Sequence, residues 1–140
     1  MSHTTTVKLR LKDLDAVERA ATTLGLELKR NQTTFRVHEG PRRCEHAIVV
    51  PNHAGAHSIG LVAVTDEKGA SAGWDLQYDG WGSNGNALTS KTGANLSRVR
   101  QEYAAEVAIE RAGKTLARAG FVTRREMLES GVLRLRMVQR

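Results

Sequence analysis

Cysteine and long hydrophobic runs are scarce in this chain of 140 residues. Cys44 is the only cysteine, so an internal disulfide is excluded, and a single thiol is typical of the reducing cytoplasm. The longest apolar runs, such as Ala47–Val50, are far shorter than the roughly 20 residues of a membrane-spanning helix. No apolar stretch of a signal peptide follows Met1–Thr4. We therefore expect a soluble, cytoplasmic protein with no membrane partner.

Acidic residues are scarce at the C-terminal end. Residues 111–140 hold eight Lys/Arg but only Glu126 and Glu129, whereas residues 1–110 hold equal numbers of both signs, so the net charge of +6 lies entirely in the last thirty residues. This asymmetry predicts an anionic partner, either nucleic acid, a nucleotide or an acidic protein surface. The alternative is a solvated face that only keeps the protein soluble. The basic candidates are Arg111, Lys114, Arg118, Arg124, Arg134 and Arg136.

The length fits one domain, residues 1–140, and the periodicities predict an α+β fold. Apolar alternation predicts a first strand over Val7–Leu11, and an apolar stripe predicts a helix that starts at Asp13 or Asp15 and ends near Gly25. We expect Leu26–Arg30 and Thr33–His38 to form a hairpin around Asn31-Gln32. Residues 39–43 are expected to form a turn.

The rest of the chain predicts three further strands, a long loop, a second helix and a final hairpin. The expected bounds are Cys44–Val50, Ser58–Thr65 and Trp74–Asp79 for the strands, Gly80–Asn95 for the loop, Asn95 to Ala119 for the helix, and Phe121–Leu128 with Val132–Val138 for the hairpin. The order β-α-β-β-β-β-β-α-β-β indicates a two-layer sandwich, with a mostly antiparallel sheet and two helices on one face. The second helix carries two apolar stripes on roughly opposite sides, which favours a homo-oligomer; a bend at Gly113 is the alternative.

Several short motifs resemble one family along nearly the whole chain. They are the opening Met1-Ser2-His3 with Asp13-Leu14-Asp15-Ala16, then Asp75-Leu76-Gln77-Tyr78, Gln101-Glu102-Tyr103-Ala104, Gly120-Phe121-Val122 and Gly131-Val132-Leu133-Arg134-Leu135. In this order they resemble the hypothetical chloroplast reading frame thirty-five family, a domain of unknown function in plastids, cyanobacteria, bacteria and phages. The resemblance implies no catalytic site. Residues 44–57 and 80–95 depart from the family pattern.

Four potential metal ligands lie close together in the sequence: Cys44, His46, His53 and His57. Zinc binds cysteine and histidine tetrahedrally, so a strand edge followed by a loop is able to supply such a set. Their spacing matches no established zinc signature. The alternative is a buried structural cysteine with surface histidines, and we expect no cofactor other than this candidate zinc.

The glycine-rich segment before the second helix is a candidate anion site. Backbone N–H groups freed by glycine bind phosphate well beside a helix N-terminus, and a lysine adds charge. The candidates are Trp81, Gly82, Ser83, Asn84 and Lys91. The segment lacks the Walker spacing, and a mobile surface loop is the alternative. Trp81 is the expected contact residue, whereas Trp74 and Tyr78 are expected in the core.

No Ser-His-Asp, Cys-His or nucleophile-elbow pattern is present, so we expect no catalysis. The sequence favours a small binding or accessory protein that engages nucleic acid or a nucleotide, and sequestration of that ligand is one way in which it would act. Two alternatives are a protein–protein adaptor that uses the second helix, and a metal-dependent enzyme at the Cys/His group.

Overall fold

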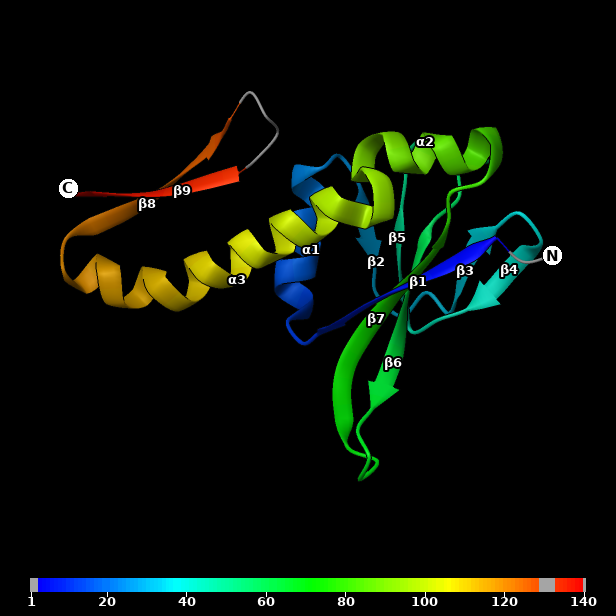
Figure 1. The fold of residues 1–140 in the computed structure, drawn as a ribbon, viewed down its shortest axis with the longest axis horizontal. Helices are drawn as coiled ribbons and strands as arrows, with labels where there is room; N and C mark the ends of the chain where they lie inside the picture. The colour runs from blue at the N-terminus through cyan, green and yellow to red at the C-terminus, as the bar shows by residue number, and fades with distance from the viewer. Residues whose placement is uncertain (1–2, 129–132, 140) are drawn as a thin grey trace.

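A five-stranded antiparallel sheet forms the centre of the computed structural model, which describes residues 3–128 and 133–139 (Figure 1). The strand order is β1-β7-β6-β5-β2. The strands are β1 (Thr4–Leu11), β2 (Glu27–Lys29), β5 (His46–Val49), β6 (Ile59–Thr65) and β7 (Ser71–Asp79). The predicted α+β class with an antiparallel sheet is therefore confirmed.

Helices cover one face of the sheet. They are α1 (Leu14–Thr23), α2 (Gly82–Thr92), the 3-10 turn η1 (Ala94–Leu96) and the first half of α3 (Ser97–Arg118). Their fully buried side chains, including Val17, Leu88 and Val99, pack with Ile48 and Leu76 of the sheet in the main core. The Asp13 carboxylate caps α1 by accepting the N–H of Ala16 at 3.0 Å, as the sequence predicts.

A small hairpin covers part of the opposite face. It consists of β3 (Thr34–Val37) and β4 (Gly40–Arg43), and Phe35 and Val37 pack with Cys44 and Ala47 in a second core. Gly60 of β6 lies directly beneath Phe35: a Cβ added there would lie 2.3 Å from the Phe35 ring. The absence of a side chain at residue 60 therefore lets the hairpin lie flat on the sheet.

Two predicted connections are wrong at this point. Leu26–Arg30 and Thr33–His38 do not pair with each other: β2 pairs with β5, and β3 pairs with β4, which occupies the expected turn 39–43. Asn31 has a φ of 62°, and its N–H donates to Nδ1 of His46 at 2.9 Å, so the chain leaves β2 without closing a hairpin. Packing in the two cores, and not the local turn, thus determines which strands pair.

The predicted loop Gly80–Asn95 is also wrong, because most of it forms α2. Leu88 is fully buried and anchors this helix. A Cβ at Gly85 would lie 2.2 Å from the carbonyl carbon of Gly80, so Gly85 allows a close approach between α2 and the end of β7. Asn95 does not cap a helix; it has a φ of 54° at the kink between α2 and α3.

The C-terminal part of the chain extends to one side of this body. The second half of α3 leads to a two-stranded antiparallel hairpin of β8 (Phe121–Met127) and β9 (Leu133–Gln139), as predicted. We call residues 111–128 and 133–139 the arm. Figure 1 shows the arm at one end of the long axis, with the start of α2 and the β3–β4 hairpin at the other. Among the described residues, no helix is both long and apolar enough to cross a membrane.

Candidate anion-binding sites

The predicted anion-binding residues fall into two groups at opposite ends of the molecule. Trp81, Gly82, Ser83 and Asn84 lie at the start of α2, while the C-terminal arginines lie on the arm (Figure 1). Lys91 joins neither group, because it occupies the last turn of α2. The structure therefore separates the basic C-terminal candidates from the candidates of the glycine-rich segment.

The arm presents exposed arginines on both of its elements. Arg111 and Arg118 are exposed on α3, and Arg124, Arg134 and Arg136 are exposed on the hairpin. Cross-strand register pairs residue 124 with 136 and residue 126 with 134, so these four side chains share one face of the ribbon. The side chain of Lys114 lies outside the described part of the structure.

One carboxylate lies within this arginine face. Glu126 Oε1 accepts from Arg136 at 2.8 Å, and Glu126 Oε2 accepts from Nε of Arg134 at 3.1 Å. These bonds, from Arg136 first and then Arg134, lower the pKa of Glu126 and keep it ionised at neutral pH. Within the described residues no acidic group pairs with Arg111, Arg118 or Arg124. The face therefore keeps a positive excess.

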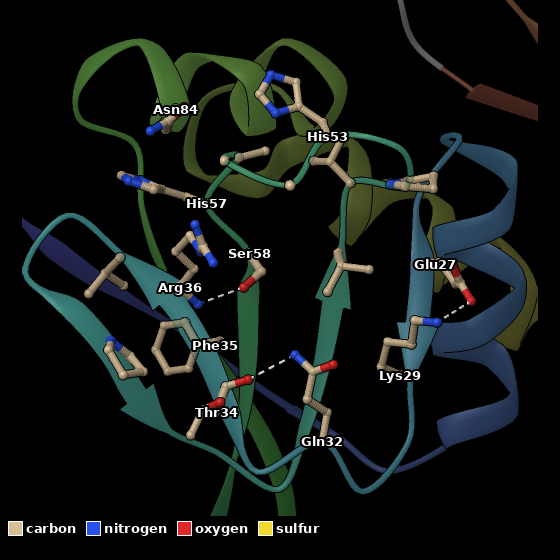
Figure 2. A pocket seen from close by; sticks show the side chains of 18 of the residues that line it. Glu27, Lys29, Gln32, Thr34, Phe35, Arg36, His53, His57, Ser58 and Asn84 are labelled. Carbon is tan, nitrogen blue, oxygen red and sulfur yellow. Dashed lines mark hydrogen bonds and ion pairs between the residues drawn. The ribbon is translucent and has the colours of Figure 1, made fainter.

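The second surface is a cavity of about 930 Å³ beside the β3–β4 hairpin (Figure 2). Its walls are the end of β2, strand β3 and the segment 50–58 that links β5 to β6, with Asn84 from the first turn of α2 at one side. Its basic lining residues are Lys29, Arg36, His38, His53 and His57. The only acidic lining residue in the described structure is Glu27, which pairs with Lys29 at 2.8 Å.

Backbone hydrogen bonds fix Arg36 in the wall of this cavity. The N–H of Arg36 donates to the Ser58 hydroxyl at 2.7 Å, and the N–H of Ser58 donates to the Arg36 carbonyl at 3.1 Å. Because Phe35 and Val37 point into the core, alternation directs the Arg36 side chain away from it. Figure 2 shows the guanidinium group beneath His57. Within the described residues no carboxylate pairs with it.

A buried aspartate holds the edge of the cavity together. Asp79 is 1% exposed, and its two carboxylate oxygens accept the N–H groups of His38 and Trp81, each at 2.8 Å. The Asp79 carbonyl accepts from Nδ1 of buried His57 at 2.8 Å. Burial raises the pKa of the Asp79 carboxyl. The two N–H bonds, together with nearby His57 and His3, lower that pKa by more than burial raises it, so the net pKa lies below its usual value.

Trp81 is exposed, as predicted for a contact residue, but it already has ring partners. The Trp81 indole is 49% exposed. The His3 ring stacks on it with 4.9 Å between the ring centroids, and the His38 ring meets it edge-on with 4.2 Å between the centroids. Trp74 is half-buried, and its ring centroid lies 5.3 Å from that of His46. Tyr78 is buried in the main core. Trp81 thus belongs to a three-ring cluster that includes His38 of the cavity wall.

The structure divides the predicted metal ligands into two pairs. Cys44 and His46 line a separate hollow of about 800 Å³, whereas His53 and His57 line the 930 Å³ cavity. Cys44 donates to the Gln32 carbonyl at 3.2 Å. No group of three or more His, Cys, Asp or Glu side chains in the described residues is arranged to hold a metal ion.

Sequence reasoning missed Arg36 and the hydrogen bonds of Asp79. Arg36 is one of several basic residues that alternate with apolar residues in the strands. Asp79 accepts the N–H of His38, which lies 41 residues before it in the sequence. No local signal marks either interaction. Comparison with family models, with curated proteins and with solved structures found no match in any of the three.

Proposed function

We propose that this is a non-catalytic nucleic-acid-binding protein whose arm contacts the phosphate backbone of a duplex. The observation that carries the proposal is the position of the charge. The whole net charge of +6 falls in residues 111–140, and the structure places the described part of that segment on an arm apart from the body (Figure 1). Clustered basic residues on one element are the electrostatic footprint of nucleic-acid binding.

The shape of the arm supports the same partner. An antiparallel two-stranded ribbon fits the major groove of B-form DNA, which is about 12 Å wide. The seven-residue strands β8 and β9 make a ribbon long enough to follow the groove wall. Arg124, Arg134 and Arg136 share one face of it and reach outward, while Arg111 and Arg118 extend the charge along α3.

Glu126 would limit the affinity of this face. It holds Arg134 and Arg136 in position but cancels one of their charges and repels phosphate. Its removal should therefore strengthen binding to a polyanion, although it frees two side chains to move. A surface that serves only solubility would show no such effect.

The test compares three variants by fluorescence anisotropy on a short labelled DNA duplex at low salt. Arg124→Gln removes an exposed arginine of the arm, and Arg43→Gln removes an exposed arginine of the body as the matched control. We expect R124Q to weaken binding several-fold, R43Q to leave it unchanged, and Glu126→Gln to strengthen it. Equal effects of R124Q and R43Q, with no gain from E126Q, would refute the proposal.

A second candidate function is a protein–protein adaptor, which one observation favours. Met127 is 58% exposed and Leu128 is 38% exposed, and both lie at the end of β8. Exposed apolar side chains at the tip of an extended element are suited to a protein contact. Salt separates the candidates, because binding to phosphates weakens steeply as salt rises and an apolar contact does not.

A further inference from the structure

We propose that the 930 Å³ cavity is a second binding site, specific for a small phosphomonoester. The cavity is formed by β2, β3, the segment 50–58 and the first turn of α2, none of which belongs to the arm, so it goes beyond nucleic-acid binding (Figures 1 and 2). Its volume falls within the roughly 300–1,000 Å³ of small-molecule sites. A phosphate group alone would fill only a small part of it, which leaves space for the organic part of the ligand.

The charge of the lining selects an anion. Glu27 is already neutralised by Lys29 at 2.8 Å, while Arg36 has no carboxylate partner among the described residues. A guanidinium group binds a phosphate through two parallel N–H bonds, a geometry that lysine does not offer. Arg36 is therefore the expected anchor of the phosphate.

The surrounding donors favour phosphate over a carboxylate, because they lie on several sides. Arg36 comes from strand β3, Lys29 comes from β2, and Asn84 comes from the first turn of α2, so the donors belong to three separate elements (Figure 2). The N-terminal end of a helix carries partial positive charge, which adds to the attraction of an anion at Asn84. A tetrahedral group with several acceptor oxygens suits donors from several directions better than a planar carboxylate does.

The wall that carries these groups is fixed before any ligand arrives. Arg36 is bonded to Ser58 through both its backbone N–H and its carbonyl, and His57 is bonded to the Asp79 carbonyl. The Asp79 carboxylate also binds the N–H groups of His38 and Trp81. Little ordering is then required on binding, which raises affinity.

Isothermal titration calorimetry on the full chain tests the site with four probes: inorganic phosphate, adenosine 5′-monophosphate, ribose 5-phosphate and uncharged adenosine. We expect heat of binding from the three probes that contain a phosphate group and none from adenosine. A preference for the nucleotide over the sugar phosphate, or the reverse, identifies the source of the phosphomonoester. Absence of binding by all three phosphorylated probes would overturn the proposal.

Three variants locate the binding. Arg36→Gln should weaken the best probe about tenfold to a hundredfold, because a hydrogen-bonded charge pair is lost. Arg43→Gln, on the same hairpin but outside the cavity wall, and Arg124→Gln, on the arm, should leave it unchanged. If R124Q weakens the probe as much as R36Q does, the probe binds the arm and the cavity proposal is wrong.

Discussion

Replacing Asp79 with asparagine tests how the edge of the cavity is held. The wild-type carboxylate accepts two backbone N–H bonds at 2.8 Å while 1% exposed. Asparagine offers one oxygen to one N–H and turns its amide group toward the other. One charge-assisted bond worth about 1.5–3 kcal/mol is lost, and one partly buried N–H is left unsatisfied at a further cost of about 1 kcal/mol. We expect a net loss of about 3 kcal/mol in the free energy of unfolding.

For a chain of this length that loss lowers the melting temperature by about 10 °C, because the unfolding entropy is about 2 cal/mol/K per residue. Differential scanning calorimetry at neutral pH measures the shift. Asp66→Asn is the matched control: Asp66 also accepts two backbone N–H bonds, at 2.8 and 2.9 Å, but in an exposed turn where water replaces them. The control should lower the melting temperature by far less.

The pH dependence gives a second check. The net pKa of Asp79 lies below its usual value, so its contribution to stability is fully present above the unfolded pKa of about 4 and is lost as pH falls through the lower folded pKa. The difference in melting temperature between wild type and D79N should therefore shrink below about pH 4. A shift of only one or two degrees at neutral pH, or a difference that does not shrink in acid, would refute this account of Asp79.

Two further predictions concern the second core. Gly60→Ala should destabilise the protein by about 1–3 kcal/mol, since its Cβ would lie 2.3 Å from the Phe35 ring. Urea unfolding measures this, and a smaller effect of G60A in a Phe35→Leu background would confirm that the ring is the obstacle. Burial raises the pKa of the Cys44 thiol to about 11, so a disulfide reagent near pH 8 should react far more slowly with the native protein than with unfolded chain. Equal rates would show that Cys44 is accessible.

The sequence predicts the fold where local pattern and burial agree. The alternation in β1, the Asp13 cap of α1 and the C-terminal hairpin all follow from residues close together in the chain. Prediction from the sequence fails where contacts between residues far apart in the chain determine the structure. Gly85 suggests a loop, yet it serves to bring α2 against Gly80, and β2 pairs with β5 instead of its sequence neighbour.

The same distinction applies to the candidate sites. Charge asymmetry alone locates the arm, because the arginines all fall within the last thirty residues; the structure adds that Arg124, Arg134 and Arg136 share one face of the hairpin. The cavity is different, since it joins β2, β3, the segment 50–58 and Asn84, which no local pattern links. The role of Asp79 likewise depends on the N–H of His38, which comes from the distant turn between β3 and β4.

The salt dependence of duplex binding tests the proposed function most directly. If four or five arm arginines each neutralise one phosphate, log affinity should fall with log salt at a slope of about −4. R124Q should make this slope shallower by about one, and E126Q should make it steeper. A slope near zero, or one that neither variant changes, would contradict the assignment of nucleic-acid binding to the arm.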